Sequence, residues 1–313
     1  MNRVLAVLAA VLAFAAPASA ESIRIIVPFA AGGPADMLAR IVAHELQTRL
    51  ATEVVVDNRG GAGGIIGFEA AARSAPDGKT LLVGSMGSQV ISPVLRPNLS
   101  FNAETALEPI ALIGSVPSVM IIRPGLGITS LDDLIAKAKQ GQNFSYGSAG
   151  VGSTMQIAAE LLNVGAGIKI AHVPYRGAGP AINDLLGSHL DIIIADFPVL
   201  LPQIQANNAI ALAMFAKQRS PMLPDVPTTA ELGYPDMLMD NWYGLMAPAG
   251  VPADLKAKIE HAALDGLHAL AVVDRLKTAG VSGTLDAKGF QARLDADFAY
   301  WRAAIKKTGI TVE

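Results

Sequence analysis

Short apolar runs alternate along the chain with stretches in which apolar residues recur at helical spacing. The run Ile23–Pro28 is rich in Ile and Val, which favours a buried strand. Residues 34–50 predict a helix, because one face of it carries Met37, Leu38, Ile41, Val42 and Leu46. This alternation predicts an α/β fold with doubly wound, mainly parallel sheets, since parallel strands need a crossover connection.

The same alternation continues to the end of the chain. Further strands are expected at 54–56, 80–83, 144–146, 168–173, 190–195, 210–215 and 242–247, and residues 110–122 form a long apolar run around Pro117. Further helices are expected at 64–73, 131–140, 153–163, 178–186, 252–278 and 287–306.

The strand and helix pattern restarts near residue 124 without a flexible linker, which predicts two lobes joined by crossing strands. We expect residues 21–123 plus 242–313 to form lobe one and residues 124–241 to form lobe two. A ligand cleft is expected between the lobes.

The chain is unusually hydrophobic for a protein outside a membrane. Hydrophobic residues make up 51% of it, and the mean hydropathy is +0.41. Residues 1–20 account for part of this, because Arg3 precedes an apolar stretch, Val4–Ala16, and a small-residue pattern that ends at Ala20. We interpret residues 1–20 as a signal peptide cleaved after Ala20, which predicts a periplasmic protein. No later window is long and apolar enough to suggest a membrane span.

Charge and composition exclude several classes of function. Without residues 1–20, the chain keeps 23 Lys and Arg and 27 Asp and Glu, a formal charge of −4, so a nucleic-acid binder is not expected. The sequence has no cysteine, which rules out disulfides, thiol nucleophiles and a lipid-anchoring cysteine. The five histidines do not cluster, and we expect neither a metal ion nor a cofactor.

Two glycine-rich turns between a strand and a helix are the main candidates for ligand binding. The first turn offers Phe29, Ala30, Gly32, Gly33 and Asp36, and Pro34 suits the first position of the following helix. The second turn offers Ser148, Ala149, Gly150, Gly152, Ser153 and Thr154. Free backbone N–H groups at such helix starts favour an anion, although each turn can also be a plain structural turn.

Three other segments are weaker candidates. The glycines of 60–67 have the wrong spacing and position for a dinucleotide fingerprint, so helix packing is the favoured interpretation. Tyr175, Arg176 and Gly177 follow a strand, where Arg176 can bind a carboxylate or pair with Asp184. Asp196 ends an apolar strand and can accept a hydrogen bond from a ligand or cap a turn. An enzyme is not favoured, since no Gly-x-Ser-x-Gly motif occurs.

Several segments together resemble one family. PFAAGGPADMLAR, VVVDNRGGAGGIIG, YGSAGVGSTMQIAAEL, HVPYRGAGPAINDLLGSHLDI and LPDVPTTAELGYP are similar to the Bug family, the extracytoplasmic solute-binding proteins of tripartite tricarboxylate transporters. This resemblance implies a two-lobed Venus flytrap fold and a carboxylate held between the lobes by N–H groups, hydroxyls and waters. It implies ligand contacts at Phe29–Asp36, Ser148–Thr154, Ser85, Tyr175–Gly177 and Asp196.

One residue departs from the family pattern. Gln156 stands where the family usually has His, so the ligand or its waters are expected to differ here.

The resulting hypothesis is a periplasmic receptor that captures a small carboxylate and delivers it to the integral-membrane permease of such a transporter. Phe29, Tyr175 and Trp242 are expected to shape the pocket. The protein is expected to be a monomer and no enzyme. Two alternatives stay open at this point: an exported carboxylic-acid enzyme on the same fold, and a ligand sensor for a signalling receptor.

Overall fold

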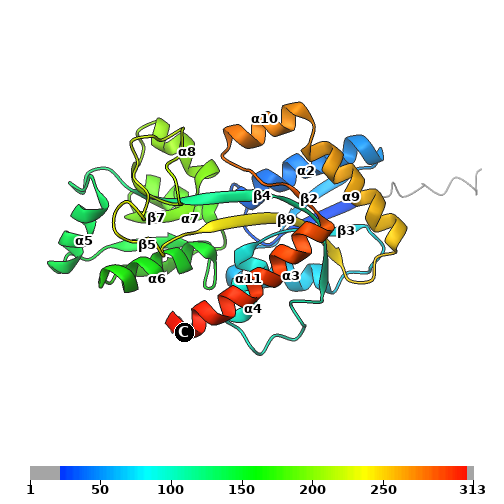
Figure 1. Cartoon of the computed structure of the whole chain (residues 1–313), viewed down its shortest axis with the longest axis horizontal. Coiled ribbons are helices and arrows are strands. Elements are labelled where there is room, and N and C mark those ends of the chain that lie inside the picture. The colour runs from blue at the N-terminus through cyan, green and yellow to red at the C-terminus, as the bar shows by residue number, and fades with distance from the viewer. Residues whose placement is uncertain (1–21, 309–313) are drawn as a thin grey trace, which may run out of the picture.

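The computed structural model describes residues 22–308 and shows an elongated molecule with two groups of elements side by side (Figure 1). The predicted signal peptide, residues 1–20, lies outside the described residues. Within 22–308, the helices are too short or too polar to span a bilayer.

The first sheet combines parallel strands with two antiparallel neighbours. Its order is β2 (Val54–Asn58), β1 (Ile23–Val27), β3 (Thr80–Ser85), β9 (Asp240–Pro248) and β4 (Leu107–Ile122). β1, β2 and β3 are parallel, whereas β9 runs antiparallel to both β3 and β4. The short strand β10 (Leu285–Asp286) pairs with β4. We call this sheet and the helices packed on it the first lobe.

The second sheet begins within the same long strand. Residues Ser118–Ile122 of β4 pair with β7 (Ile192–Asp196) and with β8 (Ile210–Phe215). β5 (Ser145–Ser148) lies parallel to β7 and to β6 (Ala171–Pro174). This sheet and its helices are the second lobe. β4 changes sheets between Pro117 and Ser118, before the boundary predicted at residue 123.

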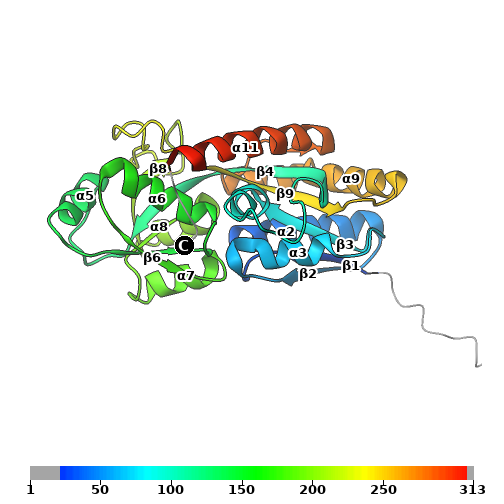
Figure 2. The same cartoon turned by 90° about the horizontal axis from the view of Figure 1, so that it is seen from below.

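Helices cover both sheets. The first lobe contains α2 (Pro34–Leu50), η1 (Ala62–Gly64), α3 (Ile65–Ala72), η2 (Gly87–Ile91), α4 (Ser92–Val94), α9 (Ala253–Leu267), α10 (Leu270–Thr278) and α11 (Ala287–Thr308). The second lobe contains α5 (Leu131–Lys139), α6 (Thr154–Ala166), α7 (Ala178–Leu186) and α8 (Phe197–Gln205). α9 packs on α2, and α11 packs along β4, as Figure 2 shows.

Both faces of the strands are buried, which explains the high hydrophobicity of the chain. On β1, Ile25 and Val27 belong to one hydrophobic cluster and Ile26 to the other. On β7, Ile193 and Ile194 divide in the same way. Successive strand residues point to opposite faces, so a strand covered by helices on both sides must be apolar throughout.

The structure corrects three sequence expectations. The helix predicted over 252–278 is two helices, because Ala269 adopts an extended conformation between α9 and α10. Periodicity does not detect a break of one or two residues when the apolar stripe continues on both sides of it. α8 was not among the helices predicted from the sequence. Pro198 lies in the first turn of α8, where its missing N–H has no helical partner to lose. The π-helix η2 was also missed.

Candidate functional site

A small cavity lies between the two lobes. Its volume is about 20 Å³, which holds roughly one water molecule and no larger ligand. First-lobe and second-lobe residues both line it: Phe29, Gly33, Pro34, Ala35, Ser85 and Tyr243 from the first, and Ala149, Ser153, Thr154, Met155, Ala178, Ala195 and Asp196 from the second. A ligand larger than water therefore requires the lobes to separate before it can enter.

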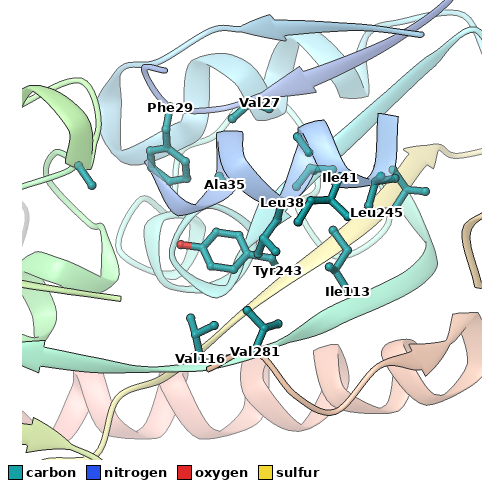
Figure 3. Packing of buried hydrophobic residues seen from close by; sticks show 14 of the residues in the cluster. Val27, Phe29, Ala35, Leu38, Ile41, Ile113, Val116, Tyr243, Leu245 and Val281 are labelled. Carbon is teal, nitrogen blue, oxygen red and sulfur yellow. The ribbon is translucent and has the colours of Figure 1, made fainter. Parts of the chain in front are cut away.

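The turn between β1 and α2 forms one wall of this cavity. Gly32 has a φ of +83°, a left-handed conformation that favours glycine, and its N–H donates to Asp36 Oδ2 at 3.1 Å. The side-chain amide of Asn58 donates to the Phe29 carbonyl at 3.1 Å. Figure 3 shows Phe29 and Tyr243 at one end of the hydrophobic cluster, with the Tyr243 hydroxyl directed away from the other labelled side chains. The turn is thus held by contacts that do not use its cavity-facing groups.

Asp36 supports this turn from outside the cavity. Its buried carboxylate accepts from Arg40 Nε at 3.1 Å as well as from Gly32. Burial alone would raise the pKa of Asp36, but the hydrogen bonds from Arg40, Gly32 and Asn58 outweigh it and hold the pKa below the ordinary value. The ionised form is therefore the one that the folded protein favours.

Replacing Asp36 by Asn is expected to destabilise the protein by about 1–2 kcal/mol at neutral pH, because charge-assisted hydrogen bonds are lost. Since the folded pKa is lowered, this stabilisation is present above the ordinary aspartate pKa and is lost as the pH falls through the folded value. Urea unfolding near pH 7 and near pH 3 tests this. An equal difference between wild type and Asp36→Asn at both pH values would contradict it.

The turn between β5 and α6 forms the opposite wall, and two hydrogen bonds of Gln156 fix it. The Ser153 hydroxyl accepts from the Gln156 N–H at 3.4 Å, while Gln156 Oε1 accepts from the Gly152 N–H at 2.7 Å. Gln156 therefore occupies one backbone donor of the turn. The Gly152 N–H is thus satisfied within the protein.

Ser148 and His172 lie beneath this turn. The Ser148 hydroxyl accepts from the Gly150 N–H at 3.1 Å and lies 2.6 Å from His172 Nε2. Burial lowers the pKa of His172, although the nearby Glu160 opposes this. Ser148 is fully buried and outside the cavity lining, and its hydrogen bonds support the turn.

Four helices begin at the cavity, since the lining residue Asp196 is the N-cap of α8, and in α2, α6 and α7 the first N–H groups carry no protein partner among the described residues. The N-cap residues of α2 and α7, Gly33 and Gly177, have no side chain to cap them. The Ser153 cap of α6 serves only Gln156, which leaves the N–H groups of Thr154 and Met155. Free N–H groups and the positive ends of three helix dipoles thus converge from both lobes, which favours an anion.

Asp196 is the charged side chain in the lining, and it ends β7. Its Oδ1 accepts from the Ser118 hydroxyl at 3.2 Å, and its Oδ2 accepts from the Asn241 amide at 2.8 Å and from the Tyr243 hydroxyl. Burial raises the pKa of Asp196 to about 6 against the opposing effect of these hydrogen bonds. Burial and the adjacent Asp196 charge also hold the pKa of Tyr243 well above its usual range, so Tyr243 remains a donor.

The lobes also touch around the cavity, where backbone carbonyls of the second lobe accept from first-lobe donors. The Ala30 N–H donates to the Arg176 carbonyl at 2.9 Å, and Arg96 Nη2 donates to the Val151 carbonyl at 2.8 Å. A Cβ atom on Gly60 would lie 2.4 Å from the Arg176 carbonyl oxygen. The glycine-rich segment 60–67 therefore forms part of the contact between lobes, which its interpretation as helix packing did not anticipate.

The cavity brings together seven of the sixteen residues singled out from the sequence: Phe29, Gly33, Ser85, Ala149, Ser153, Thr154 and Asp196. The other nine lie behind the two turns or at the contact between lobes: Ala30, Gly32, Asp36, Ser148, Gly150, Gly152, Tyr175, Arg176 and Gly177.

Three side chains with predicted roles at the pocket point elsewhere. The Tyr175 hydroxyl donates to Asp184 at 2.6 Å, and Trp242 Nε1 donates to Asp297 at 2.6 Å. Arg176 is exposed and has no ion pair within residues 22–308, so the pair with Asp184 does not form, and its contact with a ligand stays a prediction.

Sequence reasoning missed six lining residues: Pro34, Ala35, Met155, Ala178, Ala195 and Tyr243. Ala35, Met155 and Ala178 sit in the first turn of a helix, so a search for N–H donors just after each N-cap would have found these three. Tyr243 lies on β9, almost fifty residues after Asp196, and no local pattern links the two.

Comparison with known proteins adds an independent line of evidence. The family model described as "Tripartite tricarboxylate transporter family receptor" matches residues 38–310. Protein BugT from Bordetella pertussis (strain Tohama I) is 36% identical over 324 aligned positions, which cover 99% of this chain and 98% of BugT.

Solved structures show the same similarity. The periplasmic binding protein BugD matches with a TM-score of 0.88 at 32% identity, over 93% of this chain and 98% of that one. MatC from Rhodopseudomonas palustris with bound malate matches with a TM-score of 0.84 at 28% identity, over 91% of this chain and 98% of that one.

Proposed function

The chain belongs to the tripartite tricarboxylate transporter receptor family, and we propose that it binds a small carboxylate between its lobes and delivers it to the permease of such a transporter. Like the other members, it is a solute-binding protein with the two-lobed periplasmic binding fold. We further propose that the protein acts as a monomer and that cleavage after Ala20 releases the mature chain into the periplasm.

One observation carries the proposal: the starts of α2, α6 and α7 meet at a single cavity with free N–H groups. Neither lysine nor arginine lines the cavity, so an anion there would rely on backbone dipoles and hydroxyls. Malate in the relative MatC supports a carboxylate as the anion.

On this proposal, the structure represents the closed conformation of the two lobes. The cavity of about 20 Å³ is too small for malate, and backbone contacts join the lobes around it. Opening would separate the two turns and admit the ligand, and closure would bury it against both.

Catalysis has little support from the site. The pair of Ser148 and His172 is the nearest approach to a nucleophile and base, and its serine is fully buried and outside the cavity lining. Recovery of unchanged ligand after prolonged incubation with the pure protein would support a receptor, and turnover would support the enzyme alternative.

A thermal-shift screen of mono-, di- and tricarboxylates tests the proposal. Ligand at about 100 times its dissociation constant is expected to add about 2.7 kcal/mol to the free energy of unfolding. The screen should include protein that has been unfolded and refolded, because copurified ligand would mask a shift. If no carboxylate stabilises the refolded protein, the proposed function is wrong.

Delivery to a permease needs a separate measurement. Cells that lack this gene are expected to lose uptake of the carboxylate that the screen identifies, and to regain it on complementation. Normal uptake in those cells, together with a lost transcriptional response, would favour the sensor alternative.

A further inference from the structure

Asp196 is a buried carboxylate placed where the proposed function requires an anion. It is 3% exposed and lines the cavity together with the helix starts. No cation forms a salt bridge with it within residues 22–308, and the three groups that donate to it are neutral. A second carboxylate in this cavity would therefore face a like charge at short range.

One oxygen of the Asp196 carboxylate can accept a further hydrogen bond. Oδ2 accepts from both Asn241 and Tyr243, whereas Oδ1 accepts only from Ser118 at 3.2 Å. A carboxylate oxygen accepts about two hydrogen bonds, so Oδ1 retains a free lone pair. Ser118 lies where β4 enters the second sheet, and Asn241 and Tyr243 lie on β9. The carboxyl group therefore connects the cavity to both strands that pass between the lobes.

The charged groups around Asp196 do not neutralise it. On β9, Asp240 adds a further negative charge that raises the pKa of Asp196, and Asp240 itself pairs with Arg293 at 3.5 Å. Tyr243 on β9 donates to Asp196 as a neutral group. Asp36 on α2 pairs with Arg40, and His172 on β6 bonds to Ser148.

We propose that Asp196 takes up one proton from solvent when a carboxylate binds in the cavity, and that its new Oδ1–H donates a hydrogen bond to the ligand. Two carboxylates that share a site do not both ionise readily, and one proton turns their repulsion into a charge-assisted O–H···O hydrogen bond. Oδ2 continues to accept from Asn241 and Tyr243, so only the proton is consumed. The inference rests on the proposed function, because it needs a bound carboxylate.

Calorimetric titration of the mature protein with malate measures the proton directly. At about pH 7.5 both malate and free Asp196 are mostly ionised, so a proton bound in the complex must come from the buffer. The heat measured in buffers with different ionisation enthalpies is expected to give an uptake close to one proton. The affinity is expected to fall about tenfold per pH unit above the pKa of Asp196 in the free protein.

Two variants assign the proton to a residue. Asp196→Asn is expected to abolish both the proton uptake and the pH dependence, because its amide donates without titrating. Asp240→Asn removes the neighbouring charge outside the cavity, and it is expected to retain the uptake.

The possible results distinguish a failure of proton uptake by Asp196 from a failure of carboxylate binding itself. Malate binding by the wild type without proton uptake overturns the inference and leaves the proposed function standing, and this test needs no variant. An uptake that persists in Asp196→Asn also overturns it. If no carboxylate of the thermal-shift screen binds the wild type, both proposals fall.

Discussion

Gly179→Ala is expected to weaken carboxylate binding by tenfold or more while leaving the open protein folded. Gly179 lies in the first turn of α7, and a Cβ atom there would stand 2.5 Å from the Ala31 carbonyl oxygen of the first lobe. Overpacking of this kind costs about 1–3 kcal/mol, and here the cost falls on the closed state alone. The helix itself favours Ala over Gly by about 1 kcal/mol, so the unliganded protein should be no less stable.

Calorimetry with malate measures the affinity, and small-angle scattering measures whether the ligand still compacts the protein. Asn183→Ala is the matched control, because Asn183 is exposed on the same helix and makes no side-chain contact between lobes within the described residues. It should bind as the wild type does. If Gly179→Ala also binds within twofold of the wild type, the lobes do not close to the contact that the structure shows.

The alternation of strands and helices was predictable from the sequence because burial on both faces leaves long apolar runs. The bounds of α2 and α7 agree with the predicted ranges, since each helix starts at a glycine-rich turn and shows clear periodicity. The break between α9 and α10 was not predictable, because Ala269 carries no helix-stop signal. The passage of β4 from one sheet to the other also depends on tertiary pairing.

The two glycine-rich turns were found for a sound physical reason, since a sharp turn before a helix exposes backbone N–H groups. The side chains in them were less informative. Ser148 and Asp36 bond to their own turns, whereas Ala35 and Met155, which carry no polar side chain, line the cavity. Where the backbone supplies the donors, residue type indicates the shape of the turn, and only the fold identifies the groups that face the ligand.

Thr154→Pro tests whether backbone N–H groups of the second-lobe turn bind the anion, because it removes a single N–H group from that turn. Thr154 is the first residue of α6, where proline fits, and Ser153 before it is extended with φ −74° and ψ 157°, as a residue before proline prefers. A hydrogen bond from this N–H to a carboxylate should contribute about 1.5–3 kcal/mol. We therefore expect Thr154→Pro to weaken malate binding by about 10- to 100-fold, with an unchanged midpoint of urea unfolding.

Thr154→Val is the matched control for this prediction. Valine has nearly the shape of threonine, lacks the hydroxyl and keeps the N–H, so it separates the side chain from the backbone donor. Its loss of affinity should be less than about fivefold, because only a neutral hydroxyl is removed. Equal losses in the two variants would assign the effect to the hydroxyl. Full affinity in Thr154→Pro would mean that the anion does not lie at the start of α6, and the convergence of helix starts would then no longer explain binding.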